Sequence, residues 1–255
     1  MENIFHVIII SVVQGVTEFL PISSSAHLYL LSNLFGLEEE GLLLNISAHI
    51  GSLLAVVFYF KKEILNFGKN QKLFFKILLG SMPLFLFGYF IIYYNLMANI
   101  DLYKVIGWST LVFGLILYFA DRFKTNFNIQ KNFTIKNVVI IGFFQSLALI
   151  PGVSRSGIVM TAARILKFNR IDAAKISFFM SIPALAGTGF FGIYALFNQN
   201  NSLITLSSIL TIFLSFLFSY LTIKYFLVYL KKFNFNLIVV YRIFIGLVII
   251  TLIYL

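Results

Sequence analysis

Six apolar runs, each long enough to cross a lipid bilayer, constrain the fold of this chain more than any other feature. A membrane-spanning helix needs roughly 20 predominantly apolar residues. The runs lie at Leu42–Phe60, Leu73–Tyr94, Leu102–Ala120, Ala173–Phe197, Leu203–Ile223 and Leu237–Leu255. Only 11% of the 255 residues are charged, whereas about 25% is usual in soluble domains. The sequence therefore predicts an all-α integral membrane protein with six transmembrane helices in a single membrane domain, 1–255.

Two further apolar segments, Ile4–Phe35 and Val138–Ile165, are each interrupted by a proline and a cluster of small polar residues. The first interruption reads LPISSS and the second reads PGVSRSG. Val138–Ile165 has basic loops at both ends but only 28 residues, fewer than the roughly 40 that two spans need. We therefore expect a re-entrant helical hairpin at 138–165, and a second one at 4–35 that enters from the opposite face.

The basic residues predict the orientation of the chain. They gather in four connections, at 61–76, 122–136, 164–175 and 224–232, which the positive-inside rule places in the cytoplasm. This distribution explains the formal net charge of +10 by topology, so we expect no nucleic-acid partner. The chain has no cysteine, which excludes a disulfide framework, a thiol nucleophile and a thiolate metal site.

The two halves of the chain resemble inverted copies of each other. Residues 1–120 hold the hairpin 4–35 and three spans, and residues 138–255 hold the hairpin 138–165 and three spans. Gln14 precedes Pro21 by seven residues and Gln145 precedes Pro151 by six. Inverted repeats with discontinuous helices place binding sites near the bilayer midplane, so we expect the site where the two breaks meet.

Glu18 is the principal candidate in the first break. If Ile4–Leu20 is helical, Ser11, Gln14 and Glu18 form one polar stripe. Glu18 lies in the last turn, where the helix dipole disfavours a carboxylate, and a charge inside the membrane is costly unless it is paired. Glu18 therefore suits a general base or a metal ligand with a cation beside it. The alternative is a protonated glutamate that is hydrogen-bonded to a neighbouring helix.

Ser23, Ser24 and Ser25 follow the first proline and can cap a short helix. Ser24 and His27 are three residues apart on this helix, so we expect them to interact. The alternative is ordinary capping with a structural histidine. The convergence of Glu18, Ser24 and His27 on one break favours a catalytic site.

The second break combines features of an anion site. Ser154, Arg155 and Ser156 begin another short helix, and Gly152 and Gly157 permit tight turns. Exposed N–H groups at a helix start, together with a guanidinium, suit a phosphate group. The alternative is that Arg155 pairs with Glu18 as a structural bridge, and a substrate that displaces this pair would reconcile the two.

The span at Leu42–Phe60 carries a polar stripe, Asn45, His49 and Ser52, and a small-residue face of Ser47, Gly51 and Ala55. We interpret both mainly as helix packing, with His49 a candidate partner of the site. The sequence has no HExxH zinc motif, no Walker loop and no GxSxG elbow.

The motifs QGVTEFLPISSSAH and PGVSRSG resemble the two signature motifs of the undecaprenyl-diphosphatase (bacitracin-resistance) family, and AHIGSLLAVVF is also similar to that family. The first motif is an (E/Q)xxxE pattern that runs into the serine–histidine cluster. Three positions are variants. Gln14 is the permitted amide, Ser25 stands where threonine is frequent, and Ala26 stands where glycine is frequent.

The resemblance implies a multi-pass enzyme of the bacterial inner (plasma) membrane, with an active site that opens to the outer face. It would hydrolyse undecaprenyl diphosphate, a polyprenyl diphosphate lipid, to the monophosphate and phosphate. This reaction recycles the lipid carrier of cell-wall synthesis and confers bacitracin resistance. The resemblance also implies a divalent cation, magnesium or calcium, and leaves a homodimer open.

Carried over by motif, the catalytic residues are Glu18, Ser24, His27 and Arg155. Ser23, Ser25, Gly152, Ser154, Arg155 and Ser156 bind the substrate phosphates, and Glu18 and Gln14 are candidate metal ligands. Ser24 is expected as nucleophile with Glu18 or His27 as base, and His27 as nucleophile is the alternative.

Two other functional classes compete with this interpretation. A transporter of lipid phosphates would also use broken inverted repeats, Arg155 and Glu18, but it would release no phosphate. An intramembrane serine protease would need a Ser24–His27 dyad and would leave Arg155 without a role.

Overall fold

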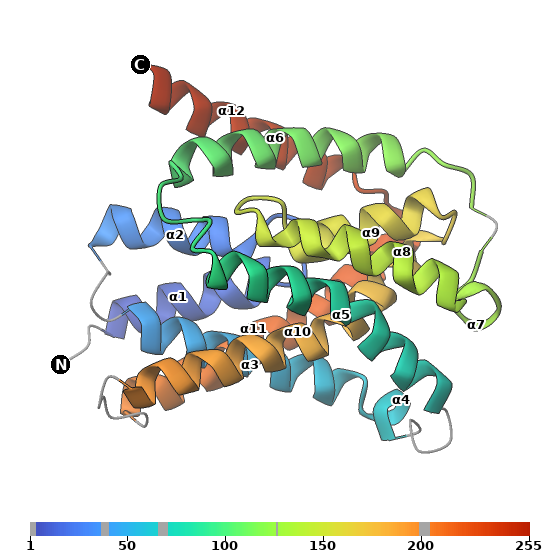
Figure 1. Cartoon of the computed structure of the whole chain (residues 1–255), viewed down its shortest axis with the longest axis horizontal. Helices are drawn as coiled ribbons and strands as arrows, with labels where there is room; N and C mark the ends of the chain where they lie inside the picture. Colours follow the sequence, from blue (N-terminus) through green and yellow to red (C-terminus); the bar gives the residue numbers. More distant parts are fainter. Residues whose placement is uncertain (1–3, 37–40, 66–70, 126, 199–204) are drawn as a thin grey trace.

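The computed structural model describes residues 4–36, 41–65, 71–125, 127–198 and 205–255, which are almost entirely helical (Figure 1). The elements are α1 (Ile4–Thr17), α2 (Ser24–Phe35), α3 (Gly41–Tyr59), α4 (Lys61–Leu65), α5 (Gln71–Tyr93), α6 (Leu102–Ala120), α7 (Ile129–Asn132), α8 (Ile135–Ser146), a 3₁₀ turn η2 (Leu147–Leu149), α9 (Arg155–Ile165), α10 (Arg170–Asn198), α11 (Leu206–Lys232) and α12 (Asn236–Tyr254). Within these residues, β pairing is limited to one isolated bridge between Phe127 and Phe168.

Six helices, α3, α5, α6, α10, α11 and α12, are long and apolar enough to cross a membrane, which confirms the six predicted spans. The bounds of α6 are those predicted, whereas α11 continues from the predicted Ile223 to Lys232. The extension, residues 224–232, reads KYFLVYLKK and contains no glycine or proline, so nothing in it ends the helix. The predicted start of this span at Leu203 and part of the connection 61–76 lie outside the described residues.

Both shorter apolar segments are broken, as predicted, but the first helix ends earlier than expected. The sequence predicted helix to Leu20, whereas α1 ends at Thr17, because Pro21 has no N–H and restricts the residue before it. The backbone N–H of Glu18 still donates to Gln14 O at 3.0 Å. Each break ends on a serine in the left-handed region, Ser23 and Ser154, both with φ of 70°.

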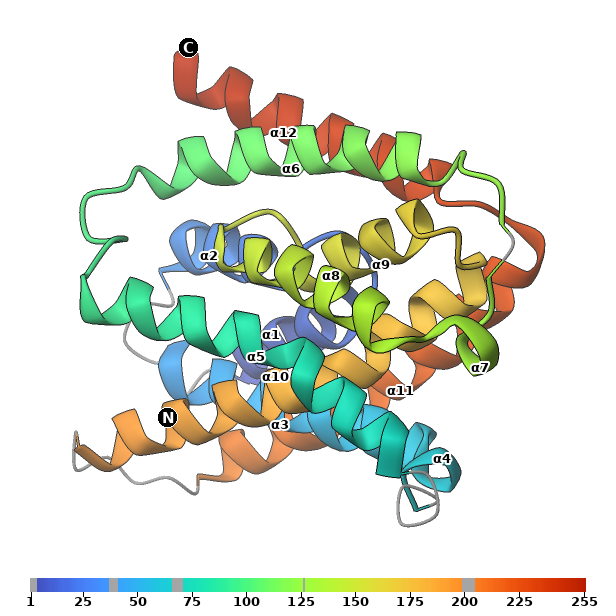
Figure 2. The same cartoon turned by 45° about the vertical axis from the view of Figure 1, so that its right-hand side comes forward.

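The broken helices lie between two groups of long helices. α6 packs along α12 at one edge, and α3, α10 and α11 pack together at the other. Figures 1 and 2 both place α2, α8 and α9 between these groups. α1 packs on α11 and α8 packs on α5, so each broken segment rests on a long helix from the other half of the chain.

The predicted small-residue face of α3 packs against α11. A Cβ added at Gly51 would lie 2.9 Å from the backbone nitrogen of Phe216, so only glycine allows this approach. Ser52 Oγ lies 2.9 Å from Ser219 Oγ, and Ser215 Oγ donates to Ala48 O at 2.7 Å. These contacts confirm the packing interpretation of this face and fix α3, which carries His49.

Side-chain caps define where several helices begin. Thr205 and Ser208 form a capping box at the start of α11. Asp101 caps α6 by accepting from the backbone N–H of Lys104 at 3.2 Å. This hydrogen bond lowers the pKa of the exposed Asp101 carboxyl below its ordinary value because it stabilises the charged form. These caps fix the starts of the spans α6 and α11.

We expect Gly51→Ala to destabilise the protein by about 1–3 kcal/mol, because overpacking forces the backbones of α3 and α11 apart. The measurement is the melting temperature of the purified protein in detergent. Gly88→Ala is the matched control, since the nearest atom to its added Cβ is Leu149 Cδ2 at 3.6 Å. Equal melting temperatures for the two variants would contradict close α3–α11 packing.

Candidate active site at the two helix breaks

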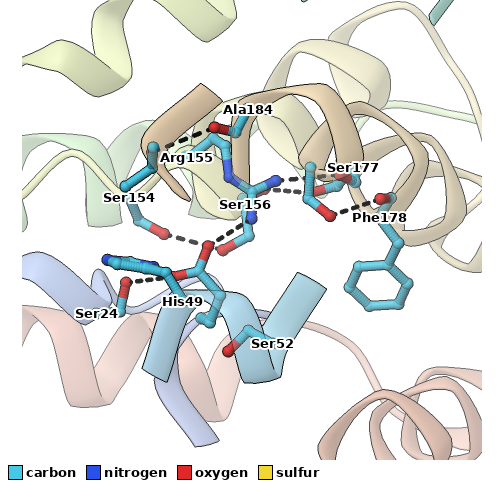
Figure 3. A network of polar contacts seen from close by, with 12 residues as sticks. Ser24, His49, Ser52, Ser154, Arg155, Ser156, Ser177, Phe178 and Ala184 are labelled. Atoms are coloured by element: carbon cyan, nitrogen blue, oxygen red, sulfur yellow. Dashed lines mark hydrogen bonds and ion pairs between the residues drawn. The ribbon is translucent and has the colours of Figure 1, made fainter. Parts of the chain in front are cut away.

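The carboxylate of Glu18 joins the two breaks. Its Oε1 accepts from Arg155 Nη2 at 2.8 Å, and its Oε2 accepts from Ser24 Oγ at 2.6 Å and from Gln14 Nε2 at 2.9 Å. Figure 3 shows Ser24 and Arg155 within one network of polar contacts. The structure therefore brings together the residues predicted from both motifs, Gln14, Glu18, Ser24 and Arg155, although they come from distant parts of the chain.

The Glu18–Arg155 pair is buried. The side chains are 6% and 13% exposed, and removing one partner from such a pair leaves an uncompensated charge in an apolar interior. A cation beside Glu18 was expected from the cost of a carboxylate in the membrane, and Arg155 is that cation. The bridge considered as the alternative role of Arg155 is the arrangement that the structure contains.

The other polar groups of the second break hold the backbone in place. Ser154 Oγ caps α9 by accepting from Gly157 N at 3.1 Å, and Ser156 Oγ donates to Leu20 O of the first break at 2.7 Å. Arg155 Nη1 donates to Ser177 O on α10 at 3.2 Å. The side-chain oxygens of both serines thus already have partners, and only Arg155 points its charge at the carboxylate.

The expectation for the two glycines of this break is half right. Gly152 has φ of 90° and occupies the turn, where a Cβ would meet the backbone of Ile106 at 2.8 Å. Gly157 lies inside α9 and forms no turn. A Cβ there would lie 2.9 Å from Arg242 Nη1, so Gly157 leaves room for an arginine that the sequence analysis did not consider.

The serines of the first break have different environments. Ser24 is partly buried and contacts Glu18, whereas Ser25 is exposed and its Oγ lies 3.3 Å from Ser23 Oγ. Ser23 stands at the N-cap position of α2, but its side chain makes no capping hydrogen bond. Only Ser24 of the three has its hydroxyl proton directed at a carboxylate.

His27 does not contact Ser24 in the hydrogen bonds of the described residues, contrary to the expectation from their spacing. Its Nδ1 lies 2.7 Å from Ser23 O, and a carbonyl only accepts, so Nδ1 carries the proton. Nε2 therefore accepts from Tyr241 Oη at 2.6 Å, and the two rings stack at 5.8 Å. Both nitrogens are occupied, which leaves Glu18 as the base in contact with Ser24.

Gln14 and His49 extend the hydrogen-bond network of Glu18 toward α3. Gln14 Nε2 lies 2.8 Å from His49 Nδ1, and since the amide nitrogen donates, Nδ1 accepts and Nε2 carries the proton. Gln14 Oε1 is buried and has no hydrogen-bond partner. His49, considered from the sequence as a candidate partner of the site, thus contacts it through the amide of Gln14.

The buried oxygen of Gln14 is the feature that fits a divalent cation. No group of three or more His, Cys, Asp or Glu side chains able to hold a metal occurs in the described part of the chain. The available oxygens are those of Glu18 and Gln14, one carboxylate and one amide. Magnesium is commonly bound by one or two carboxylates completed by water and substrate phosphates, so this pair fits such an ion only together with a phosphate ligand.

Arg242 is the residue of this region that the sequence analysis missed. It is 1% exposed and has no acidic partner among the salt bridges of the described residues. Its Nη1 donates to Pro21 O at 3.0 Å and its Nη2 to Gly152 O at 3.0 Å, and Val153 O accepts from both at 3.1 Å. One guanidinium therefore ties the backbone of the first break to that of the second.

A signal for Arg242 was present in the sequence. It is an arginine within the apolar span IVVYRIFIGLV, and ionisable residues inside membrane spans are usually functional. Tyr241 precedes it and contacts His27, so two consecutive residues of α12 serve the first break.

Comparisons with known proteins agree with the motifs. A family model described as "Bacitracin resistance protein BacA" matches residues 7–248. The protein named undecaprenyl-diphosphatase of Pelagibacter ubique is 48% identical, with 99% of each chain covered. Those of Saccharophagus degradans and Jannaschia sp. are 37% and 34% identical, with 96% and 99% of each chain covered.

The chain belongs to the bacitracin resistance, or undecaprenyl-diphosphatase, family. The matched region of this family contains both breaks and also Tyr241 and Arg242. The chain is accordingly a multi-pass membrane protein of a bacterial family.

We expect Arg242→Lys to lower the free energy of unfolding by at least about 2 kcal/mol, because each buried carbonyl left without a donor costs about 1–3 kcal/mol. A single ammonium cannot reach the carbonyls of both breaks and of Thr110, which Arg242 Nε also contacts. The measurement is the melting temperature in detergent. Arg122→Lys is the control because Arg122 lies exposed over the Tyr118 ring. If Arg242→Lys were as stable as this control, Arg242 would not be the clamp between the two breaks, meaning the guanidinium that holds Pro21 O and Gly152 O together.

Proposed function

We propose that this chain hydrolyses undecaprenyl diphosphate to undecaprenyl phosphate and inorganic phosphate, and so recycles the lipid carrier of cell-wall synthesis. The observation that carries the proposal is the contact of one carboxylate, Glu18, with a serine hydroxyl at 2.6 Å and a guanidinium at 2.8 Å. A base, a nucleophile and a phosphate-binding cation thus share one buried point. End-to-end similarity to proteins named undecaprenyl-diphosphatase supports the same reaction.

Substrate binding begins with an exchange of partners at Arg155. A diphosphate carries more negative charge than one carboxylate, and arginine binds phosphate oxygens in a bidentate manner. The N-termini of α2 and α9 add N–H donors and the positive ends of their helix dipoles. Arg155 leaves Glu18 for the terminal phosphate of the substrate, and Oε1 of the carboxylate becomes free for another partner.

Glu18 then acts as the base for Ser24. Without Arg155, the carboxylate accepts the proton of Ser24 Oγ, and this oxygen attacks the terminal phosphorus. The bond to the bridging oxygen breaks, the departing undecaprenyl phosphate takes the proton from Glu18, and the phosphoryl group remains on Ser24, which leaves Glu18 ionised for the second step. A water then attacks the phosphoserine with Glu18 as base, releasing inorganic phosphate and regenerating the serine hydroxyl. Arg155 stabilises the charge on the transferring phosphoryl group in both steps.

The hydrogen bonds of His27 favour Ser24 over His27 as the nucleophile. Both ring nitrogens are occupied, one by Ser23 O and the other by Tyr241 Oη. In this arrangement His27 positions the backbone of Ser23, directly before the attacking residue. The role of His27 is therefore to orient the start of α2.

The proposal includes a divalent cation, magnesium or calcium, held by Gln14 Oε1 and Glu18 together with diphosphate oxygens. The unpartnered, buried Oε1 of Gln14 supports this ligand set. When bound, the ion would neutralise charge on the diphosphate and so assist departure of the monophosphate.

The proposal also includes the topology, an inverted repeat of two re-entrant hairpins with the site open to the outer face. The same φ of 70° at Ser23 and Ser154 supports equivalence of the two breaks. So does the packing of α1 on α11 and of α8 on α5, because each hairpin arm then rests on the corresponding helix of the other half. The basic connections between the spans support a cytoplasmic location for the face of the protein opposite this opening.

We expect the purified protein to release phosphate from undecaprenyl diphosphate, and Ser24→Ala to release it at least about 1,000-fold more slowly, because nucleophile removal is that costly. Ser25→Ala is the matched control and should lose less than about tenfold, since the Ser25 hydroxyl bonds to Ser23 and not to Glu18 or Arg155 within the described residues. Arg155→Ala excludes contaminating phosphatases. Binding of the lipid diphosphate without phosphate release by the wild type would favour a transporter instead.

The same assay tests the metal. Phosphate release should stop in the presence of a chelator and resume with added magnesium or calcium, and Gln14→Leu should need more metal for half-maximal rate. Full activity in the chelator would remove the cation from the proposal without affecting the roles of Ser24 and Glu18.

The absence of cysteine from the chain allows a direct test of orientation. We expect Tyr94→Cys, at the end of α5, to react with a membrane-impermeant maleimide in intact cells, and Lys232→Cys, at the end of α11, to react only after permeabilisation. Both parent residues are exposed in the structure. The opposite labelling pattern would invert the proposed topology.

A further inference from the structure

An open cavity lies apart from the two breaks, where α6 ends, α10 begins and α11 connects to α12. Figure 2 shows the end of α6, the start of α12 and the connection from α11 on the right-hand side of the molecule. The cavity has a volume of about 790 Å³, and its polar lining includes Arg122, Lys124, Asn169, Arg170, Asn234 and Asn236. This volume is within the range of small-molecule sites, roughly 300–1,000 Å³.

One residue of the cavity lining is a buried carboxylate that holds two arginines. Asp121, at the C-terminal end of α6, is 5% exposed. It accepts from Arg164 Nε at 3.0 Å, from Arg170 Nε at 2.8 Å and from Phe235 N at 3.3 Å. One negative charge is therefore shared by two guanidinium groups, and a positive charge remains uncompensated.

Arg164 and Arg170 differ in how many of their guanidinium nitrogens remain free to donate to a ligand. Arg164 Nη1 donates to Phe168 O at 2.6 Å, and its Nη2 donates to Asp121 O and Phe123 O at 2.6 and 3.1 Å, so its nitrogens are all in use. Arg170 makes hydrogen bonds only through Nε within the described residues, and its side chain is 37% exposed. Its Nη1 and Nη2 are thus available at the cavity.

Further positive groups surround Arg170. Lys124 is exposed and makes no salt bridge among the described residues, and Arg122 lies over the Tyr118 ring at 4.2 Å. The cavity lies at the N-terminal ends of α10 and α12, whose dipoles favour an anion, and at the C-terminal ends of α6 and α11, whose dipoles oppose one, so the side chains decide its charge preference. The lining therefore carries four cationic side chains against one carboxylate.

We propose that this cavity is a binding site for a phosphate group, supplied either by the headgroup of an anionic phospholipid or by free inorganic phosphate. The fork of Arg170 suits two phosphate oxygens, and Lys124 adds a mobile point charge. Basic pockets between the ends of membrane helices recognise anionic headgroups in this way. The site is distinct from Glu18 and Ser24 and does not depend on the proposed reaction.

Two probes distinguish the sources of phosphate. The first is inorganic phosphate, titrated calorimetrically into the full-length protein in detergent. The second is phosphatidylglycerol, measured by native mass spectrometry of protein from mixed phosphatidylglycerol and phosphatidylcholine nanodiscs. We expect Lys124→Gln to weaken binding about fivefold and Arg170→Gln to weaken it more strongly. Lys131→Gln is the control because Lys131 is an exposed cation that does not line the cavity.

The pattern among the variants decides the outcome. Phosphate binding that depends on Lys124 and Arg170 identifies the free anion as ligand, and retention of phosphatidylglycerol with the same dependence identifies the headgroup. Since the Lys124 side chain makes no hydrogen bond or salt bridge among the described residues, its variant separates ligand binding from folding. Phosphate release by Lys124→Gln should equal that of the wild type. Absence of binding for both probes, or equal loss in Lys131→Gln, would overturn the proposal.

Discussion

Two helix breaks packed among the apolar spans contain backbone carbonyls that must find hydrogen-bond donors, and Arg242 supplies these donors to both breaks. Irregular backbone at membrane depth persists only where protein groups or a water-filled cavity satisfy it. Arg242 reaches Pro21 O on one side and Gly152 O on the other. The positions of Ser24 and Arg155 follow, because each lies within three residues of a carbonyl that this guanidinium holds.

The clamp also separates two tasks that a single arginine could not combine. Arg242 bonds to fixed carbonyls and to no carboxylate among the described residues, so its charge stays near the breaks without moving. Arg155 bonds chiefly to Glu18, a partner that a phosphate can replace. One cation thus maintains the backbone while the other is free to exchange, and substrate binding need not disturb the fold.

The spans and the breaks were predictable because hydropathy and proline act locally. The hydrogen-bond partners of the side chains at the breaks could not be predicted in the same way. Ser24 and His27 are correctly spaced for contact on a helix, but the ring of His27 bonds instead to Ser23 O and to Tyr241 on α12, far away in the sequence. Arg242 was missed for a related reason. Its acceptors are 221 and 90 residues distant, and backbone carbonyls carry no sequence signature.

Equivalence of the two halves, as proposed, would extend to the backbone but not to the charges. Both breaks carry a buried glutamine just before the interruption. Gln14 donates to Glu18 and His49, whereas both amide atoms of Gln145 are buried without a partner. The second break has no carboxylate in PGVSRSG, and it contributes the cation instead. A carboxylate in each half would place two like charges at the meeting point, which membrane burial makes costly. One acidic and one basic break neutralise each other in the structure. In the proposed reaction a substrate phosphate takes the place of Glu18 beside Arg155, so the same asymmetry would serve both the stability of the site and its response to the ligand.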